Sequence, residues 1–250
     1  MINIETSGPV AVLQMTHGKA NALDTALCQE LVARLGDVAS GGHRAAVLTG
    51  HGGIFSAGVD LLRLREGGRA YLAGFLPALS EAFLAVFDCP VPVVAAVNGH
   101  AIAGGCILAS ACDHRVMNAG HGRIGVTELL VGVPFPVTAL EILRFAVGTR
   151  RLAELTCFGR TYPAADALRL GLADEAVAGE SVTDRAVAVA TGFAELPAGP
   201  LRHTRTQLRR PVLDRIAQQR AADDTLVHQM WDSPAARQAI TEYVTRTLHH

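Results

Sequence analysis

The sequence predicts an α/β fold, with a layered core of parallel strands and helices followed by an all-helical C-terminal region. Two apolar segments, residues 45–49 and 91–97, each run into glycines and then into the start of a helix. Repeated strand–turn–helix units of this kind build a parallel layered core. From about Ser181 onward the pattern is helical and no strand signal returns. We therefore expect a β/α core over residues 1–190 and a helical region over residues 191–250.

The spacing of apolar residues predicts the individual elements. Residues 2–15 alternate in polarity and predict two edge strands joined by a Gly8-Pro9 turn. Leucines at positions 23, 27, 31 and 35 give a helix over residues 21–38 one apolar face, and Asn21 or Asp24 can cap its start. The later strands are predicted at 45–49, 91–97, 114–117 and 172–177. The later helices are predicted at 59–65, 71–87, 104–112 and 136–147, with two short helices within 152–170.

Prolines divide the helical tail. Pro197, Pro200, Pro211 and Pro234 predict breaks between its helices, because proline lacks the N–H group that a helix interior needs. The last two residues, His249 and His250, are either native or the remnant of a purification tag.

Composition excludes several classes of protein. The 250 residues are 50% hydrophobic and 18% charged, which is too apolar and too weakly charged for an intrinsically disordered chain. The 22 basic and 23 acidic residues give a formal net charge of −1. This balance argues against a nucleic-acid-binding protein and against a protein that binds anionic membranes.

Residues 89–112 carry no Asp, Glu, Lys or Arg, and a segment of this length could span a bilayer. Pro90, Pro92, the Asn98-Gly99 turn signal and the glycine pair at 104–105 favour a strand, a tight turn and a buried helix instead. We therefore expect no membrane-spanning segment here.

Five cysteines are present, an odd number with no CxxC spacing. This pattern argues against a disulfide framework and against a zinc site, and it favours a reducing, cytoplasmic location. The N-terminus has neither a basic segment nor a long apolar segment, so we expect no signal peptide.

Three segments could carry chemistry. In FSAGVDL, residues 55–61, small residues bring the backbone close to a neighbour just before a helix starts. In NGHAIAGGCI, residues 98–107, a strand again leads through small residues into a helix start. Free N–H groups at two such helix starts, aimed at one point, would stabilise a developing negative charge. The simpler interpretation of the first segment is a glycine turn with Asp60 as helix cap.

The third segment is IGVTELLVGVPF, residues 124–135. Glu128 is the only ionisable residue between Arg123 and Glu141. Carboxylates in apolar surroundings are costly and usually have raised pKa values. A capping or salt-bridged glutamate is the alternative. Glu141 lies on an apolar helix, and we expect it to pair with an arginine.

Together, FSAGVDL, AAVNGHAIAGGC, ACDHRV and IGVTELLVGVP resemble the crotonase family, the enoyl-CoA hydratase/isomerase superfamily, in order and spacing. GRTYPAADALRLGLADEAV resembles the segment that follows in the family. The resemblance implies a spiral of ββα units with a C-terminal helical region used in trimerisation. It also implies an acyl-CoA thioester as substrate, with no cofactor beyond the coenzyme A that the substrate carries.

The resemblance also implies roles for particular residues. The N–H groups of Val59 and Gly104 would hold the thioester oxygen as it becomes an enolate, and Glu128 would be the catalytic carboxylate. The other implied substrate contacts are Ala57, Asp60, Leu61, Thr127, Ile107 and Phe135. Phe135 could instead be a core residue. Arg63 and Arg65 could meet the phosphates of coenzyme A or form a solvated helix face.

One residue departs from the hydratase pattern. Typical hydratases of this family carry a second glutamate where this sequence has Ile107. The resemblance therefore favours the Δ3,Δ2-enoyl-CoA isomerases, in which one carboxylate removes a proton at C2 and returns one at C4. The alternatives are another family lyase, either a hydratase or a decarboxylase, and a non-catalytic acyl-CoA-binding paralogue. A trimer or a dimer of trimers is expected from the family and from the apolar residues of the tail.

Overall fold

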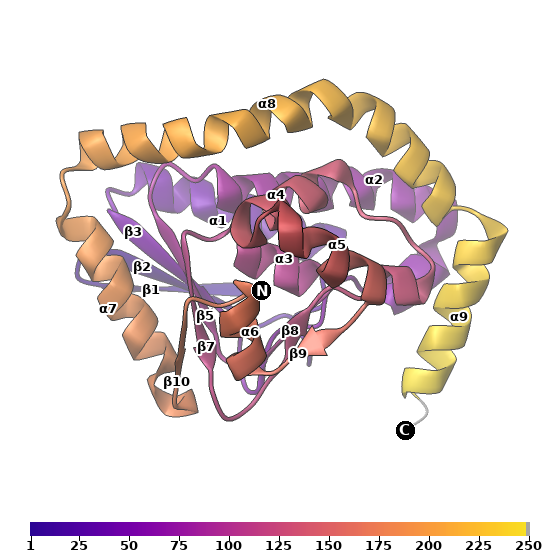
Figure 1. Ribbon diagram of the computed structural model, residues 1–250, viewed down its shortest axis with the longest axis horizontal. Coiled ribbons are helices and arrows are strands. Elements are labelled where there is room, and N and C mark those ends of the chain that lie inside the picture. The colour runs from indigo at the N-terminus through magenta and orange to yellow at the C-terminus, as the bar shows by residue number, and fades with distance from the viewer. Residues whose placement is uncertain (249–250) are drawn as a thin grey trace.

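Six strands form the larger of two β-sheets (Figure 1). The computed structural model describes residues 1–248, so His249 and His250 lie outside the described residues. The strands, in sheet order, are β1 (Ile2–Ser7), β2 (Val10–Met15), β3 (Ala45–Thr49), β5 (Val93–Val97), β7 (His114–Asn118) and β10 (Glu175–Val177). The β1–β2 pair is antiparallel and every other pair in this sheet is parallel. The predicted α/β core is confirmed.

A second sheet consists of much shorter strands. They are β4 (Ile54–Ser56), β6 (His100–Ile102), β8 (Ile124–Gly125) and β9 (Thr161–Tyr162), in that order across the sheet. The sequence does not predict them, because strands of two or three residues show no alternation of polarity. β6 follows directly on the Asn98-Gly99 turn, where a turn alone was expected.

The two sheets are joined by a repeated ββα unit. The repeats are β3–β4–α2 (Leu61–Phe87), β5–β6–α3 (Gly104–Ala111) and β7–β8–η1–α4, where η1 is a 3₁₀ turn at Glu128–Val131 and α4 covers Val137–Val147. Each unit adds one strand to each sheet, so the chain advances as a spiral. The crossover is tight: a Cβ atom on Gly99 would lie 1.8 Å from the carbonyl oxygen of Gly53, so only glycine fits there.

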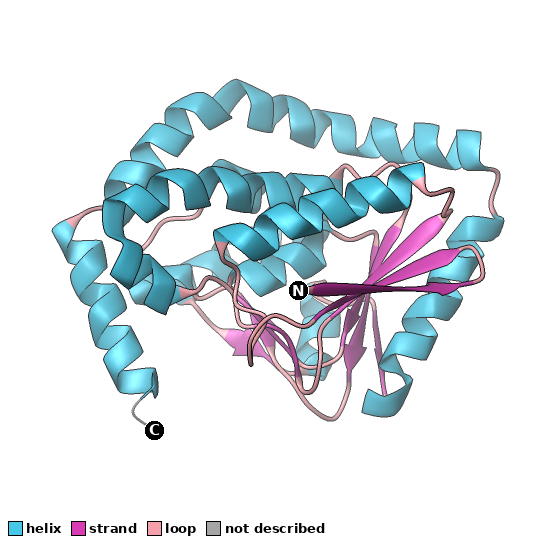
Figure 2. Ribbon diagram, turned by 180° about the vertical axis from the view of Figure 1, so that it is seen from behind, coloured by secondary structure: helices cyan, strands magenta, loops and turns pink. Residues whose placement is uncertain are grey.

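Side chains of the large sheet alternate between two apolar layers. On β3, Ala46 and Leu48 face the main core, whereas Ala45 and Val47 face α7 (Val182–Glu195) on the opposite side. The buried residues of α7 repeat every fourth position and are mostly alanines, which lets the helix approach the sheet closely. These residues are Val182, Ala186, Ala190 and Ala194. Figure 2 shows the sheet from behind, between its helical layers.

The helices of the main core and of the C-terminal region complete the chain. They are α1 (Thr25–Ser40), α5 (Thr149–Phe158), α6 (Ala164–Leu170), the 3₁₀ turn η2 (Gly179–Ser181), α8 (Ala198–Trp231) and α9 (Pro234–Leu248). Asp24, one of the two predicted caps, accepts a hydrogen bond from the N–H of Leu27 at the start of α1. α8 runs along one side of the molecule, and α9 turns back toward α2 and η1 (Figure 1).

Buried ion pairs attach α8 to the core. Arg205 and Arg209 both bind the Asp113 carboxylate, at 2.7 and 2.8 Å. Glu141 on α4 pairs with Arg215 of α8 at 2.7 Å and with Arg144 at 3.1 Å, which confirms the expected arginine partner. Removing one member of such a pair leaves a buried charge without its partner, so these contacts fix where α8 lies.

Two predictions about helix breaks were wrong. α8 runs without interruption through Pro200 and Pro211. Pro200 lies in the first turn, where no intrahelical acceptor is needed for its missing N–H. Pro211 lies in the interior of α8 and removes one backbone hydrogen bond, and the packing and ion pairs along α8 offset this loss. The predicted helices at 59–65 and 71–87 are joined as α2, and the expected loop is reduced to a kink at Gly68, where φ is +55°.

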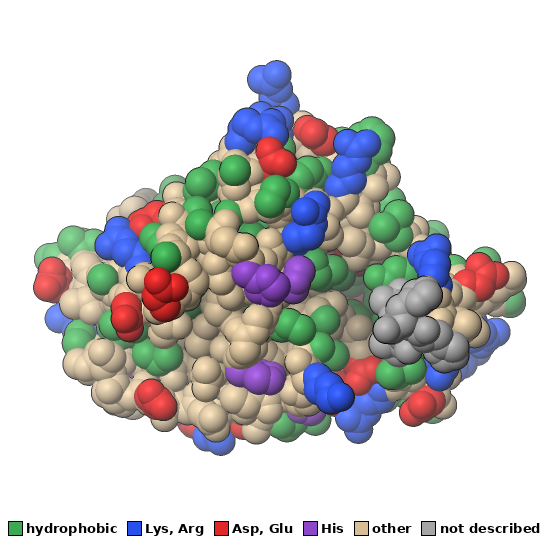
Figure 3. All heavy atoms as spheres, turned by 90° about the horizontal axis from the view of Figure 1, so that it is seen from below, with side chains coloured by type: hydrophobic (Ala, Val, Ile, Leu, Met, Phe, Trp, Pro, Cys, Tyr) green, Lys and Arg blue, Asp and Glu red, His purple; other side chains and the backbone are tan. Residues whose placement is uncertain are grey.

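α2 is long and apolar enough to cross a membrane by length and composition alone. Half of its most apolar window is buried inside the protein, where α2 contacts α1, α3, α4, α8 and α9. The uncharged segment 89–112 forms the expected strand (β5) and buried helix (α3), together with the short strand β6 that was not expected. Figure 3 shows basic and acidic side chains interspersed over one face, in keeping with the small net charge.

Candidate active site

The three predicted segments meet at one small cavity of about 60 Å³, which we call the Glu128 cavity. Most of its lining residues have apolar side chains, and Glu128 is the one that can carry a charge. The lining residues are Ala57, Val59, Leu61, Ile102, Ala103, Thr127, Glu128, Val131, Val133, Trp231 and Tyr243. Three segments spread over residues 55–135 thus form one site, because successive ββα units bring the ends of β4, β6 and β8 side by side.

The first helix start presents the N–H group of Val59. Val59 forms an isolated parallel bridge with Leu23: the Leu23 N–H donates to the Gly58 carbonyl at 2.7 Å, and the Asp60 N–H donates to the Leu23 carbonyl at 3.0 Å. In such a parallel bridge, successive N–H groups point to opposite sides. The N–H of Val59 therefore points away from Leu23, while the Val59 residue itself lines the cavity.

The second helix start presents the N–H group of Gly104. Gly104 is the first residue of α3, so its N–H has no intrahelical acceptor. Ala103, the residue before it, lines the cavity and has a positive φ of 50°. This uncommon conformation for alanine belongs to the sharp turn from β6 into α3. A neighbouring glycine is also required: a Cβ atom on Gly105 would lie 2.4 Å from the carbonyl oxygen of Ser56.

Gly58 brings the two helix starts together. Its φ is +84°, and a Cβ atom there would lie 2.7 Å from the Ile102 carbonyl oxygen and 3.2 Å from the Gly104 nitrogen. Only glycine allows this approach. The Val59 and Gly104 N–H groups consequently come from two backbone segments in direct contact. Val59 lines the Glu128 cavity, whereas Gly104 is not among its lining residues and directly follows Ala103, which is. Two N–H donors that point to one oxygen can stabilise the negative charge that the oxygen gains.

Glu128 is the buried acid of the site. Its side chain is 8% exposed, and its Oε2 atom has no hydrogen-bond partner. Burial among apolar groups raises the pKa of Glu128 from 4.5 to about 7, although hydrogen bonds from its own backbone and from that of Thr127 act in the opposite direction. A carboxyl group with a pKa near 7 can both accept and return a proton at neutral pH.

This raised pKa predicts how stability depends on pH. The native state holds the Glu128 proton more tightly than the unfolded chain, so ionising it costs stability as the pH rises from about 4.5 through about 7. Glu128→Gln removes this cost. Relative to wild type, the free energy of unfolding of the variant should rise by about 3 kcal/mol between pH 4 and pH 8, at about 1.4 kcal/mol per pKa unit. Urea denaturation at several pH values measures this. A difference that stays constant with pH would mean that Glu128 is not desolvated.

The structure brings some of the proposed site residues to the cavity and leaves others away from it. Ala57, Leu61 and Thr127 line it together with Val59 and Glu128. Asp60 does not, and it caps α2 by accepting a hydrogen bond from the Arg63 N–H. Three further residues are absent from the cavity lining: Gly104, which directly follows the lining residue Ala103, and Ile107 and Phe135, which lie in the hydrophobic core.

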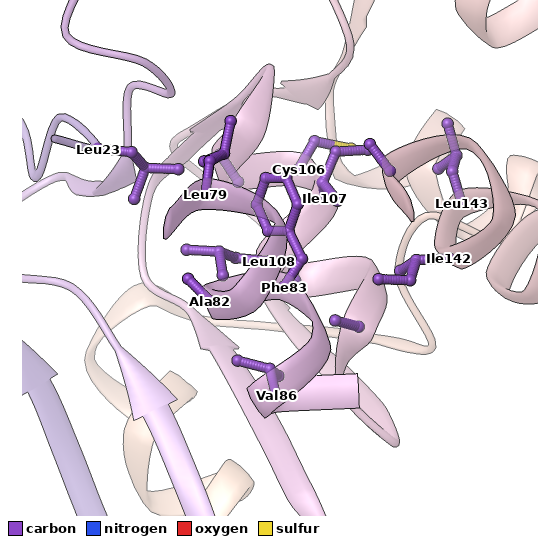
Figure 4. Packing of buried hydrophobic residues seen from close by; sticks show 14 of the residues in the cluster. Leu23, Leu79, Ala82, Phe83, Val86, Cys106, Ile107, Leu108, Ile142 and Leu143 are labelled. Carbon is purple, nitrogen blue, oxygen red and sulfur yellow. The ribbon is translucent and has the colours of Figure 1, made fainter. Parts of the chain in front are cut away.

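Ile107 has no exposed surface. Figure 4 shows it among core side chains that include Phe83, Leu79 and Leu143. An apolar side chain at this position packs without needing a hydrogen-bond partner, whereas a carboxylate would need one. Among the residues that the structure describes, Glu128 is thus the only carboxylate in the lining of the Glu128 cavity.

The C-terminal helices supply two lining residues that the sequence analysis did not place at the site. Trp231, the last residue of α8, donates its indole N–H to the Pro134 carbonyl at 3.0 Å. Tyr243 reaches the cavity from α9. Trp231 is the only tryptophan in the chain, and this is the one feature of the sequence that could have drawn attention to it.

Arg63 and Arg65, the two predicted candidates for contact with the coenzyme A phosphates, do not line the Glu128 cavity. The Arg63 guanidinium binds the buried Asp24 carboxylate, and Arg65 lines a different cavity. Within residues 1–248, no group of three or more His, Cys, Asp or Glu side chains is placed to hold a metal ion.

Comparisons with known proteins agree on one family. The model of the enoyl-CoA hydratase/isomerase family matches residues 5–249. Mitochondrial enoyl-CoA delta isomerase 1 of Mus musculus is 31% identical over 225 residues, which cover 88% of this chain and 78% of that protein. A putative enoyl-CoA hydratase of Thermus thermophilus is 34% identical over 83% of each chain. The crystal structure of human mitochondrial Δ3-Δ2-enoyl-CoA isomerase superposes with a TM-score of 0.94 at 27% identity, over 99% of this chain and 98% of that one.

Proposed function

Because the chain belongs to the enoyl-CoA hydratase/isomerase family, we propose that it isomerises 3-enoyl-CoA thioesters to 2-enoyl-CoA thioesters. The family resemblance and the crotonase-like fold expected from the motifs are both confirmed. An acyl-CoA thioester is the substrate class of this family. The particular reaction, and the roles of individual residues, form the proposal.

The backbone donors would polarise the thioester. Its carbonyl oxygen accepts hydrogen bonds from the N–H groups of Val59 and Gly104. When C2 loses a proton, the electron pair of the C–H bond moves toward this oxygen and gives a dienolate. The two donors bind the enolate oxygen more strongly than the neutral carbonyl, so they lower the barrier.

Glu128 would move the proton. Its carboxylate removes a proton from C2, and the resulting carboxylic acid returns a proton to C4. The C3–C4 double bond has then become a C2–C3 double bond, with no net change in atoms or charge. A pKa of about 7 lets one carboxyl group serve as base and then as acid.

The observation that carries the proposal is the lone carboxylate in an apolar cavity. Hydration would need a water molecule held and activated, and a second carboxylate usually helps to hold it. Here Ile107 stands at that sequence position and offers no hydrogen bond. An apolar lining also disfavours water that would compete for the dienolate.

A panel of thioesters tests the proposal. Isomerisation of a 3-enoyl-CoA creates a conjugated thioester, so its absorbance rises. Hydration of a 2-enoyl-CoA destroys the conjugation, so its absorbance falls. We expect a fast rise with 3-enoyl-CoA and a much slower fall with 2-enoyl-CoA. Fast hydration of crotonyl-CoA with no action on 3-enoyl-CoA would overturn the proposal.

Hydratase activity is the second candidate. The 34% identity to a putative enoyl-CoA hydratase supports it, and Glu128 alone would then have to activate the water. A non-catalytic acyl-CoA-binding role is less well supported, since a binding protein has no need of a buried carboxylate whose Oε2 atom has no hydrogen-bond partner. The reaction as proposed requires no cofactor or metal, and we propose a cytoplasmic location from the cysteine pattern.

Assembly is a separate prediction. Several large apolar side chains of the C-terminal half are exposed, notably Leu208 (60%), Leu226 (54%), Met230 (51%) and Phe145 (41%). Exposed apolar surface of this kind favours association. We expect a trimer or a dimer of trimers, and therefore a light-scattering mass of three or six times 26.3 kDa. A mass of one chain at micromolar concentration would contradict this.

A further inference from the structure

A cavity of about 190 Å³ lies between α4, α8 and the start of β7, and we call it the arginine cavity. Within residues 1–248 it shares no lining residue with the Glu128 cavity. Its charged lining residues are Asp113, Arg115, Arg205 and Arg209, and its apolar ones include Phe145 and Leu208. A single buried water needs only about 10–15 Å³ of such space, so the arginine cavity has room for a small ligand.

The charges of this cavity are not balanced. Three guanidinium groups share its lining with one carboxylate, that of Asp113. The Asp113 carboxylate accepts two hydrogen bonds from Arg205, at 2.7 and 2.8 Å. It accepts one more from Arg209 and one from the Val93 N–H, each at 2.8 Å. A carboxylate offers about four acceptor positions, so Asp113 has none left for further donors.

Arg209 and Arg115 have donors without acceptors. They are only 4% and 7% exposed, and the Nε atom of each is shielded from solvent and has no hydrogen-bond partner. Arg115 pairs at 2.8 Å with Asp174, a partly exposed carboxylate outside the cavity lining, so three cations still face only two anions. Burial lowers the pKa of Arg209, and the charge of Arg205 acts in the same direction. An anion bound beside these two guanidinium groups would offset the cost of burying them.

The mouth of the arginine cavity is apolar. Phe145 of α4 and Leu208 of α8 line the cavity, and both side chains are exposed. A ligand with an anionic end and a short apolar body would place the first beside the guanidinium groups and the second against these two side chains. Among anions, a carboxylate matches the planar guanidinium fork with two parallel hydrogen bonds.

We propose that the arginine cavity binds a carboxylate that carries a small apolar group, with Arg115 and Arg209 as its partners. This site is separate from the reaction proposed at Glu128 and does not depend on it. The same chemistry has two sources: a free short-chain carboxylate in solution, or an Asp or Glu side chain of a second copy of this chain. The exposed Phe145 and Leu208 would contact either one.

Calorimetry with butyrate at fixed ionic strength tests for a free ligand, and butyramide, which is similar in size and uncharged, is the control. We expect wild type to bind butyrate saturably and not to bind butyramide. Arg115→Met should weaken butyrate binding at least about tenfold, because it removes a hydrogen bond to a charged group. In that variant Asp174 still accepts a hydrogen bond from the backbone N–H of position 115, at 2.9 Å in wild type. Arg210→Met removes an exposed arginine of α8 outside the lining and should bind butyrate as wild type does.

A carboxylate placed at the mouth of the cavity supplies a second test. Leu208→Glu changes an exposed side chain, so it costs the core little. We expect the introduced carboxylate to bind the guanidinium groups itself and to abolish butyrate binding. Leu226→Glu is the matched control, because Leu226 is also exposed on α8 and lies outside the cavity lining. That variant should bind butyrate as wild type does.

The results separate the two sources and can overturn the inference. Loss of butyrate binding in Arg115→Met and Leu208→Glu, but not in their controls, assigns the cavity to free carboxylates. If wild type binds no butyrate, a smaller light-scattering mass for Arg115→Met than for Arg210→Met assigns the cavity to a carboxylate of a second copy. Butyrate that binds all variants equally, or no butyrate binding together with equal masses, would overturn the inference.

Discussion

Replacing Glu128 by glutamine is expected to lower the turnover of 3-enoyl-CoA by about 10²–10⁴-fold, the usual range for loss of a general acid–base catalyst. Glutamine keeps the size of the side chain but cannot accept the C2 proton. The backbone donors and the rest of the Glu128 cavity lining are unchanged, so the dissociation constant of a saturated acyl-CoA should change little. Steady-state kinetics and calorimetry on the same preparation measure both quantities.

The pH profile is the control for this result. In wild type, kcat/KM should rise with pH through an apparent pKa of about 7, because only ionised Glu128 removes a proton. The residual kcat/KM of Glu128→Gln should not show this rise with pH. A variant that retains most of its turnover, or that retains the step near pH 7, would remove Glu128 from the mechanism.

Removing the Val59 N–H is expected to lower turnover by about 10²–10³-fold, the usual cost of losing one oxyanion-hole donor. Side-chain truncation cannot test a backbone donor, whereas Val59→Pro deletes the N–H itself. An ester in place of the 58–59 amide deletes the same donor without fixing φ. Turnover of 3-enoyl-CoA is the measurement in both cases.

A matched ester before Leu62 controls for the change of backbone chemistry. The Leu62 N–H lies in the first turn of α2 and outside the cavity lining. That variant should keep near-wild-type turnover. If the ester at Val59 is as active as the ester at Leu62, the oxyanion site lies elsewhere.

The large sheet could be predicted from sequence because burial on both faces leaves a clear signal. Residues 45–49 are apolar throughout and form β3 as predicted. β5 starts at Val93, two residues later than predicted, and Pro92, which precedes it, has no N–H for the ladder. The strands of the second sheet could not be predicted from sequence. They are only two or three residues long, and they are strands because they pair with strands of other repeats.

Glu128 could be singled out because it is the one ionisable residue in an apolar stretch. The lack of a hydrogen-bond partner at its Oε2 atom and its raised pKa both depend on residues of four other segments. The local sequence around Glu128 does not contain those residues. Trp231 and Tyr243 follow Glu128 by more than 100 positions in the chain. Their place at the site depends on where α8 ends and α9 turns back, which the ion pairs of α8 and the packing of α9 determine.

The central claim is that one carboxylate carries a proton from C2 to C4 in a cavity with little water. A 3-enoyl-CoA labelled with deuterium at C2 tests this directly. Early in the reaction in ordinary water, the account predicts 2-enoyl-CoA with part of the deuterium at C4, because the proton on Glu128 is returned before it exchanges. Product with only solvent hydrogen at C4 at the earliest times, or a hydrated product, would contradict the account.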